Sequence, residues 1–166
     1  FLCILYHICK TLVKIAVITT GIPAKKRMIQ GGITMPTLEE IRTRFQADRF
    51  ASELTGAVIR EAEPGRAVCT LALRPEHMNA NHAPMGGAVF TLADFAFAVA
   101  ANAFAEHPTV SQHVSITFLS PAKGRELSAE ARCLKAGRTT CLYEVRVADE
   151  LGAFVAQASV NGFTVR

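Results

Sequence analysis

The chain has 166 residues, half of them hydrophobic and 19% charged, and its formal net charge is +4. Five basic residues within the first 34, a stretch without acidic residues, account for this excess, and without them the net charge falls to −1. They are Lys10, Lys14, Lys25, Lys26 and Arg27. Net charge therefore gives no argument for nucleic-acid binding, and the remaining residues, about 130, form one domain large enough to bury a core.

Residues 1–34 do not share the pattern of the rest. They begin with apolar runs that Lys10 and Lys14 interrupt, and they lack the small-residue cleavage site of a signal peptide. Residues 30–34, Gln-Gly-Gly-Ile-Thr, back-translate into a sequence like a bacterial ribosome-binding site, directly before Met35. We therefore expect residues 1–34 to be a mis-assigned extension and a single domain to span residues 35–166. A membrane anchor is the alternative for residues 1–34, and it requires that they be translated.

The first predicted element of the domain is a short helix from Thr37 to about Asp48. Thr37 and Glu40 have the spacing of a capping box, in which two side chains bind the free backbone amides at a helix start. The apolar residues of this helix fall on one stripe, made of Leu38, Ile41 and Phe45. We expect the stripe to cover an edge or an end of a sheet.

Six segments show the alternation of apolar and polar residues that is typical of half-buried strands. They are Gly56–Ala62, Arg66–Leu73, Val110–Leu119, Leu127–Lys135, Thr139–Ala148 and Ala153–Val165. Short turns such as Glu63-Pro64-Gly65 connect most of them. Short connections favour antiparallel pairing, because parallel strands need a crossover of about a dozen residues.

Between the second and third of these segments, Gly86–Ala105 is almost uniformly apolar and carries one carboxylate, Asp94, near its middle. An ionised carboxylate in apolar surroundings must find a partner, shift its pKa or face a polar cleft, so Asp94 is a candidate functional residue. A membrane span is the alternative, but the Ala and Phe content, Asp94 and Asn102 disfavour it. We expect a helix wrapped completely by the sheet. The fold class is then α+β, a curled antiparallel sheet of about five or six strands around one long central helix.

The start of this helix offers backbone donors. Pro84 suits a helix start, and Gly86 and Gly87 leave the first amides unshielded, so these amides can hold a developing oxyanion. Close packing under the sheet is the structural alternative for the two glycines. Asp94 lies eight residues after Gly86, about 12 Å along a helix, so one reacting carbonyl cannot touch both groups of one chain. If both act on one carbon, the mechanism requires a homodimer with two composite sites.

Asn79 and the run Gly86–Asp94, GGAVFTLAD, resemble the signature of the PaaI-like hotdog-fold acyl-CoA thioesterases. The resemblance extends through Val110–Ala122 and the last strands, and it covers nearly everything after Met35. It implies the hotdog fold, hydrolysis of an aromatic or a short- to medium-chain acyl-CoA, and a homodimer that assembles further as a dimer of dimers. It implies no cofactor beyond the coenzyme A of the substrate.

The resemblance also assigns roles to individual residues. It implies that Asp94 is the nucleophile or the general base and that the Gly86 amide polarises the thioester carbonyl. Asn79 would help to position the nucleophile or the thioester, and Ser111 would orient the attacking water. In the implied dimer, Asn79 and Gly86 face Asp94 and Ser111 of the other chain.

Met85 stands where the family pattern usually has His before the two glycines. His82 is a candidate substitute for the lost hydrogen bond, and Met85, Gly87 and Phe90 are candidate substrate contacts. We further expect Phe90, Phe95 and Phe97 to line an apolar groove for the acyl group. Lys135 and Arg138, with Lys123 and Arg125, are candidate contacts for the phosphates of coenzyme A, and solvated turn residues are the alternative.

The remaining residues exclude other chemistry. The five histidines lack clustered acidic or thiol partners, so we expect no metal site. No C-x-x-C pair is present, and Cys69, Cys133 and Cys141 lie in predicted strands, which favours free thiols in a reducing cytoplasm. A non-catalytic acyl-CoA-binding protein and a hotdog dehydratase are the alternative functions; Asp94 argues against the first and Met85 against the second.

Overall fold

The computed structural model describes residues 29–30 and 33–166, and the chain divides into two units, Phe1–Met35 and Pro36–Arg166. In the first unit, β1 (Ile29–Gln30) and β2 (Ile33–Thr34) form a two-stranded antiparallel pair. The hypotheses of a mis-assigned start and of a membrane anchor concern residues 1–34, and all but these four lie outside the described residues. The second unit carries the fold and the site.

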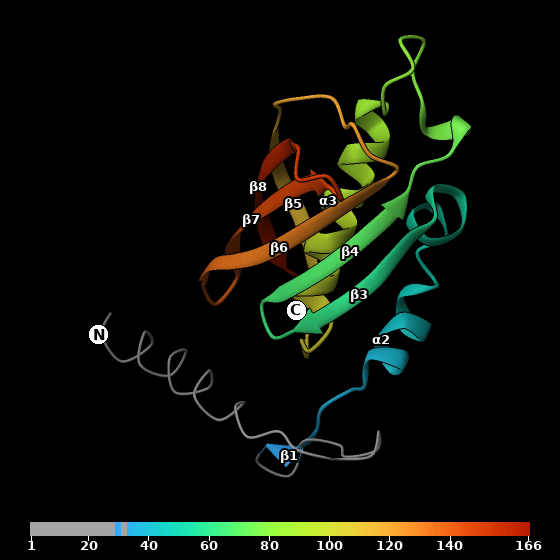
Figure 1. Cartoon of the computed structure of the whole chain (residues 1–166). Coiled ribbons are helices and arrows are strands. Elements are labelled where there is room, and N and C mark those ends of the chain that lie inside the picture. The colour runs from blue at the N-terminus through green and yellow to red at the C-terminus, as the bar shows by residue number, and fades with distance from the viewer. Residues whose placement is uncertain (1–28, 31–32) are drawn as a thin grey trace. The chain divides into compact units, whose positions relative to one another are not determined.

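A six-stranded antiparallel sheet curls around helix α3 (Gly86–Asn102) in the second unit, as Figure 1 shows. The strands in chain order are β3 (Ala57–Glu63), β4 (Arg66–Ala72), β5 (Thr109–Phe118), β6 (Glu126–Ala136), β7 (Thr140–Asp149) and β8 (Phe154–Thr164). Their order in the sheet is β3-β4-β6-β7-β8-β5, so β3 and β5 are the edge strands. The predicted α+β fold, with a curled antiparallel sheet around one long helix, is confirmed.

The core lies between α3 and the inner face of the sheet. Leu92, Ala96 and Val99 of α3 are fully buried, and Phe97 packs edge-on against Tyr143 of β7 with ring centroids 5.2 Å apart. The helix ends at Asn102, three residues before the predicted end. The Asn102 side chain donates to the carbonyl oxygens of Ala98 and Thr109 and accepts from the Thr109 amide. It therefore ties the end of the helix to the first residue of β5.

Helix α2 (Leu38–Phe45) begins with the predicted capping box but ends before Asp48. Asp48 instead starts a second element, η1, a π-helix over Phe50–Thr55. The Asp48 carboxylate accepts from the Ala51 amide, and its carbonyl oxygen accepts from the Ser52 amide. The prediction of one helix to about Asp48 is therefore wrong, because Asp48 forms the hydrogen bonds that begin a new turn.

Helix α3 is not completely wrapped, contrary to the expectation. One stripe along it stays partly or wholly exposed, at residues Gly87, Phe90, Thr91, Asp94, Ala98 and Ala101. These residues are three or four apart, so they share one face of the helix. The stripe is apolar except for Thr91 and Asp94. We call it the α3 stripe.

The described helices give no candidate for a membrane crossing, since none is long and apolar enough. The three described cysteines, Cys69, Cys133 and Cys141, are free thiols. Burial raises the pKa of the Cys69 thiol to about 12. This thiol is therefore unreactive at neutral pH.

Candidate active site

The loop that leads into α3 is built around Asn79. Its side-chain oxygen accepts from the amides of Asn81 (2.9 Å) and Ala83 (3.2 Å), and its own amide donates to the Ala83 carbonyl (2.8 Å). His82 adopts φ 58°, a left-handed conformation that non-glycine residues seldom take, at the tip of this turn. Asn79 therefore shapes the loop, and its side-chain oxygen is already occupied within it.

His77 fixes the point where the helix starts. It is buried, its Nδ1 accepts from the Arg74 amide (3.1 Å), and its carbonyl oxygen accepts from the Met85 amide (2.7 Å). Met85 is the N-cap residue and its side chain is 57% exposed. The sequence argument gave His77 no role. The nearby Pro75 was the one available signal of a tight turn that would hold it.

The first turn of α3 is open. No side chain caps this end of the helix, and within the described chain the Gly86 and Gly87 amides donate no hydrogen bond. A Cβ added at Gly86 would lie 3.1 Å from Cζ of Phe118, closer than ordinary side-chain contacts. Two free amides at a helix N-terminus, reinforced by the helix dipole, form a site for negative charge.

A cleft of about 390 Å³ borders this end of the helix. Gly86 and Val89 of α3 form one wall, and Phe118 of β5 with the segment Leu119–Ala122 forms the other. We call it the Gly86 cleft. It gives a ligand access to the open end of α3.

Asp94 is the second focus of the site. It is half buried, and among the described residues its Oδ1 is the buried side-chain oxygen that lacks a hydrogen-bond partner. Burial raises the pKa of its carboxyl, the nearby Ser111 hydroxyl lowers that pKa, and the negative charge of Asp48 raises it again. The net direction is upward. A desolvated carboxylate with a raised pKa and a free oxygen is suited to accept a proton or to attack a carbonyl.

The predicted site residues thus fall into two groups on one protomer. Asp94 and Ser111 lie together at the middle of α3. The others, Asn79, His82, Met85, Gly86 and Gly87, gather at its N-terminal end, and the half-exposed Phe90 lies between the groups on the α3 stripe. Eight residues of helix, about 12 Å, separate Gly86 from Asp94.

The phenylalanines do not share a groove, so that expectation is wrong. Phe97 is 1% exposed and belongs to the core, and Phe90 is on the open stripe. Residues two apart on a helix point to different sides, which separates Phe95 from Phe97. Phe95 is also a core residue, 3% exposed, but it reaches the wall of a second cleft and packs edge-on against Phe45 of α2 with centroids 6.0 Å apart.

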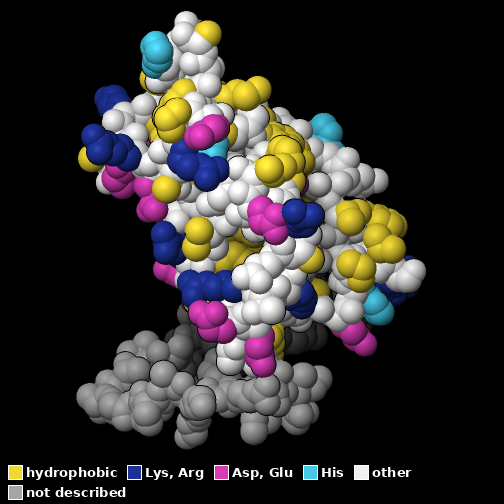
Figure 2. Space-filling model, turned by 90° about the vertical axis from the view of Figure 1, so that its right-hand side faces the viewer, with side chains coloured by type: hydrophobic (Ala, Val, Ile, Leu, Met, Phe, Trp, Pro, Cys, Tyr) yellow, Lys and Arg dark blue, Asp and Glu magenta, His cyan; other side chains and the backbone are white. Residues whose placement is uncertain are grey.

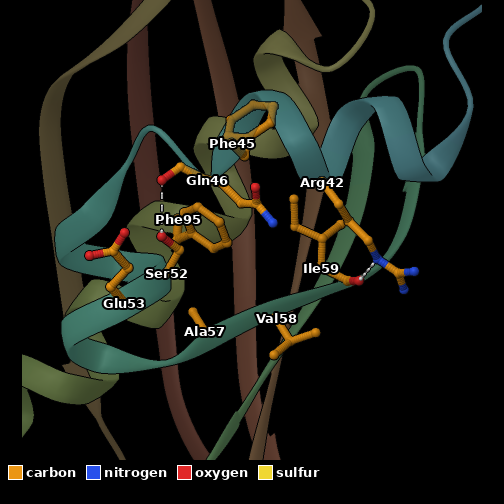
Figure 3. A pocket seen from close by; sticks show the side chains of 9 residues that line it. All are labelled: Arg42, Phe45, Gln46, Ser52, Glu53, Ala57, Val58, Ile59 and Phe95. Atoms are coloured by element: carbon orange, nitrogen blue, oxygen red, sulfur yellow. Dashed lines mark hydrogen bonds between the residues drawn. The ribbon is translucent and has the colours of Figure 1, made fainter.

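That second cleft, also about 390 Å³, lies between α2, η1 and β3 (Figure 3). Phe45, Phe95, Ala57, Val58 and Ile59 give it apolar walls, and Arg42, Gln46, Ser52 and Glu53 lie around them. We call it the Phe95 cleft. Neither η1 nor this cleft was foreseen, although the capping side chain of Asp48 was visible in the sequence.

The four basic candidates lie at or near turns. Lys135, close to the end of β6, and Arg138, in the turn between β6 and β7, are exposed, and they line neither cleft. Lys123 and Arg125 lie in the segment between β5 and β6, which continues from the Gly86 cleft. None of the four side chains forms an ion pair among the described residues. In the same part of the chain, no three His, Cys, Asp or Glu residues are placed to hold a metal ion.

Comparisons with known proteins agree with this architecture. The family model described as Thioesterase superfamily matches residues 85–156. A provisionally named esterase from Archaeoglobus fulgidus is 36% identical, covering 77% of this chain and 83% of the relative. Acyl-coenzyme A thioesterase 13 from Homo sapiens is 30% identical (75% and 91%), and acyl-coenzyme A thioesterase PaaI from Escherichia coli K12 is 31% identical (68% and 79%).

Solved structures show the same fold. The E. coli PaaI protein superposes with a TM-score of 0.69 at 24% identity, covering 78% of this chain and 97% of that one. A Streptococcus mutans protein bound to acetyl CoA superposes with a TM-score of 0.62 at 26% identity, covering 66% and 88%. The chain therefore belongs to the thioesterase superfamily, as a PaaI-like member with the hotdog fold. Its class of reaction is the hydrolysis of a thioester.

Proposed function

We propose that the protein is an acyl-CoA thioesterase in which Asp94 drives hydrolysis and the Gly86 amide polarises the carbonyl. One observation carries this assignment: the buried, unpartnered Oδ1 of Asp94 beside the Ser111 hydroxyl. Burial makes the ionised form of Asp94 costly, and its free oxygen forms no contact that stabilises the fold. We therefore assign this oxygen to contact with the substrate or with water. The acyl-CoA thioesterases among the relatives and the acetyl CoA in the S. mutans structure support the substrate class.

Two routes of hydrolysis fit the geometry. In the first, Asp94 takes a proton from water, the hydroxide adds to the thioester carbon, and the oxyanion accepts a hydrogen bond from the Gly86 amide. Collapse breaks the C–S bond, and the thiolate of coenzyme A takes the proton back from Asp94. In the second, Asp94 attacks directly, expels the thiolate and forms a mixed anhydride, which water then hydrolyses. Both end with a free acid, coenzyme A and a regenerated Asp94.

A homodimer completes the site in this proposal. The distance along α3 prevents Gly86 and Asp94 of one chain from meeting at one carbonyl, so the partner subunit's Gly86 faces Asp94. The α3 stripe and the edge strand β5 support a contact here, because both carry exposed apolar side chains, near Ser111 at one end of β5 and near Gly86 at the other. Val110 is 51% and Phe118 53% exposed. A two-fold contact would cover these side chains on both subunits at once.

The proposal also assigns a role to each of the other predicted contact residues. Asn79 acts by holding the loop before α3, and His82, Met85, Gly87 and Phe90 border the reacting thioester. Lys135 and Arg138, which form no ion pair among the described residues, are left for the phosphates of coenzyme A. Stacking of two dimers into a tetramer, a cytoplasmic location and the absence of a further cofactor complete the proposal.

The decisive experiment is thiol release from acyl-CoAs by residues 35–166 and by the full chain, with Asp94→Asn as the test variant. We expect kcat to fall by about 10²–10⁴-fold, because the amide cannot accept the proton or attack. Glu106→Gln, which also removes one carboxylate but in an exposed turn after α3, is the matched control and should retain wild-type kcat. Equal activity of Asp94→Asn and Glu106→Gln, with both folded, would refute the assignment.

A further inference from the structure

We propose that Arg74 and His77 are positioning residues for the Gly86 amide, the oxyanion donor of the proposed mechanism. Together they connect the end of η1 to the open end of α3, and they act through Gly86 without contact to the substrate. This role rests on the proposed function, because the Gly86 amide binds an oxyanion only there. Changes at Arg74 and His77 should then lower kcat and leave KM nearly unchanged.

The Gly86 N–H belongs to a peptide bond whose carbonyl is held by the helix. The Met85 carbonyl oxygen accepts from the amides of Ala88 (2.9 Å) and Val89 (3.3 Å), so it points into the first turn of α3. Because the N–H of a trans peptide bond points opposite to its C=O, the Gly86 N–H points out of the helix end. Helix ends fray, and this one has no side-chain cap. The direction of the Gly86 N–H therefore depends on how firmly Met85 is held from the other side.

His77 holds Met85 from the loop side. Its carbonyl oxygen accepts from the Met85 amide at 2.7 Å. The His77 ring is buried (6% exposed), and its Nδ1 accepts from the Arg74 amide at 3.1 Å. In return, the His77 amide donates to the Arg74 carbonyl at 2.9 Å. These reciprocal bonds fix the His77 backbone, and with it the oxygen that holds Met85.

The Arg74 side chain connects this loop to η1. Its Nη2 donates to the carbonyl oxygens of Leu54 (2.9 Å) and Thr55 (3.4 Å), the last two residues of η1. The same nitrogen lies 3.4 Å from Nε2 of His77. The last carbonyls of a helix lack donors within it, so a guanidinium is a suitable cap for them. Gly56, which follows η1, packs on this guanidinium, since a Cβ added there would lie 3.6 Å from Nη2.

The Arg74 guanidinium differs in its contacts from the other cations near η1. Figure 2, which shows the side of the molecule that carries α2 and η1, has basic and acidic side chains next to one another. Two such pairs are Arg42 with Glu39 and Arg49 with Glu53, each at 2.9 Å. In the part of the chain that the structure describes, Arg74 forms no ion pair, and its guanidinium donates to backbone carbonyls instead. Arg74 therefore fixes one backbone segment against another.

A small displacement of the Gly86 N–H is enough to affect the rate. The N–H must meet an oxyanion that develops only in the transition state, at a distance of about 2.7–3.1 Å. A displacement of about 1 Å in a positioned group can cost about 10²-fold in rate. An interaction made only in the transition state changes kcat and kcat/KM together and leaves KM unchanged. Loss of the connection through Arg74 and His77 should thus appear in kcat.

Two variants of His77 separate the ring acceptor from the bulk of the ring. His77→Leu keeps a similar volume and removes the acceptor of the Arg74 amide, whereas His77→Asn places its side-chain oxygen near the position of Nδ1. In thiol release from phenylacetyl-CoA and octanoyl-CoA, we expect His77→Leu to lower kcat about 10- to 100-fold, with KM within about twofold of wild type. His77→Asn should recover kcat to within about threefold. Equal losses of kcat in the two variants, or a loss confined to KM, would overturn the proposal.

Arg74 offers a variant that the fold tolerates, because its side chain is exposed. Arg74→Met keeps most of the side-chain length and removes the donors to Leu54 and Thr55. We expect kcat to fall about three- to tenfold with unchanged KM. Arg49→Met removes an exposed guanidinium at the other end of η1 and is the matched control, with wild-type kcat expected. Equal kcat in these two variants would overturn the role of Arg74. Arg74→Met also replaces His77→Leu in every measurement if the latter does not fold.

A measurement without turnover separates the positioning role from the proposed function. The NMR order parameter of a backbone amide is about 0.85 where the chain is rigid and below about 0.6 where it is flexible. For the Gly86 amide we expect a rigid value in the wild type and in His77→Asn, and a flexible value in His77→Leu. The same order parameter in all three proteins would overturn the positioning role, even if Asp94→Asn is inactive. A lower order parameter in His77→Leu alone, with Asp94→Asn as active as wild type, would overturn the proposed function and support the connection between His77 and Gly86.

Discussion

The two ends of α3 differ in how completely their backbone groups are satisfied. At the C-terminal end, Asn102 accepts from the Thr109 amide and donates to the carbonyls of Ala98 and Thr109, with all three distances between 2.7 and 2.9 Å. At the N-terminal end, no side chain caps the helix, and the Gly86 and Gly87 amides have no acceptor in the described fold. The closed end joins the helix to β5, and the open end borders a cleft.

The C-terminal end of α3 therefore serves stability, and the N-terminal end serves the proposed function. A helix end without a cap forgoes stabilisation that a Ser, Thr or Asp at the N-cap would supply, about 1 kcal/mol. Met85 at that position supplies none, and the amides stay available to a ligand. Asp94, halfway along, repeats the pattern with a buried oxygen that nothing in the fold uses. Changes at the open positions should therefore alter rates, and changes at the closed end should alter stability.

After Asp94→Asn, the largest effect on kcat is expected from Gly86→Pro. Proline at the first position of a helix is compatible with the fold, but it removes the N–H that holds the oxyanion. We expect kcat to fall about 10²–10³-fold with the helix retained. Gly86→Ala is the control because it keeps the N–H and adds only the Cβ that approaches Phe118. If alanine and proline reduce kcat equally, crowding by the side chain explains the loss and the amide has no catalytic role.

Mixing two inactive variants tests whether the open end serves the partner subunit. A protomer with Asp94→Asn keeps its Gly86 amide, and a protomer with Gly86→Pro keeps its Asp94. Random dimers of the two restore one intact site in half of the molecules, which gives about a quarter of wild-type turnover. The measurement is thiol release after joint refolding of the two chains. Turnover that stays at the level of the parent variants would show that each site lies within one chain.

Ser111→Ala gives a smaller effect, in the pH profile. The Ser111 hydroxyl lowers the pKa of the Asp94 carboxyl, so its removal raises a pKa that burial has already raised. The base form is active, hence the acidic limb of kcat against pH should move to higher pH. On the plateau the loss should be about tenfold or less. A limb that moves to lower pH, or stays in place, would contradict the assignment of Ser111 as the group that lowers the pKa of Asp94.

The raised pKa of Asp94 also predicts a cost in stability, because the ionised form that is active in catalysis destabilises the fold. Because the pKa of Asp94 is higher in the folded than in the unfolded chain, its stabilising contribution is complete below the unfolded pKa. It is lost as the pH rises through the folded pKa. At neutral pH the ionised form opposes folding, so Asp94→Asn should raise the Tm while it lowers kcat.

The sequence predicted the sheet well and the small elements poorly. All six strand predictions agree with the structure to within one residue at each end, because alternation of apolar and polar residues follows directly from one buried face. The end of α2 and the π-helix η1 were missed. They depend on which backbone amide the Asp48 side chain binds, and a single sequence does not reveal that choice.

The site shows the same limits. Asp94 stood out because it interrupts an apolar run, and its proximity to Ser111 agrees with the expected pairing. The prediction that Phe90, Phe95 and Phe97 share a groove was wrong. The spacing of Phe95 and Phe97, about 200° around a helix, already argued against it. The unpartnered Oδ1 and the Phe95 cleft depend on how α2 and η1 pack, which periodicity alone does not specify.

The smallest effect on rate, and a clear effect on stability, is expected from Asn102→Ala. The substitution leaves the Thr109 amide without its 2.7 Å acceptor in a half-buried position, so we expect a loss of about 1–2 kcal/mol in the free energy of unfolding. Thr91→Ala removes a single hydrogen bond within α3, 2.9 Å to the Gly87 carbonyl, and should cost less. Urea titration measures both, and kcat/KM should stay within about twofold of wild type because Gly86, Asp94 and Ser111 keep their contacts. If kcat/KM falls together with stability in Asn102→Ala, the closed end of α3 controls the position of Asp94, and the two ends of the helix do not divide stability from function.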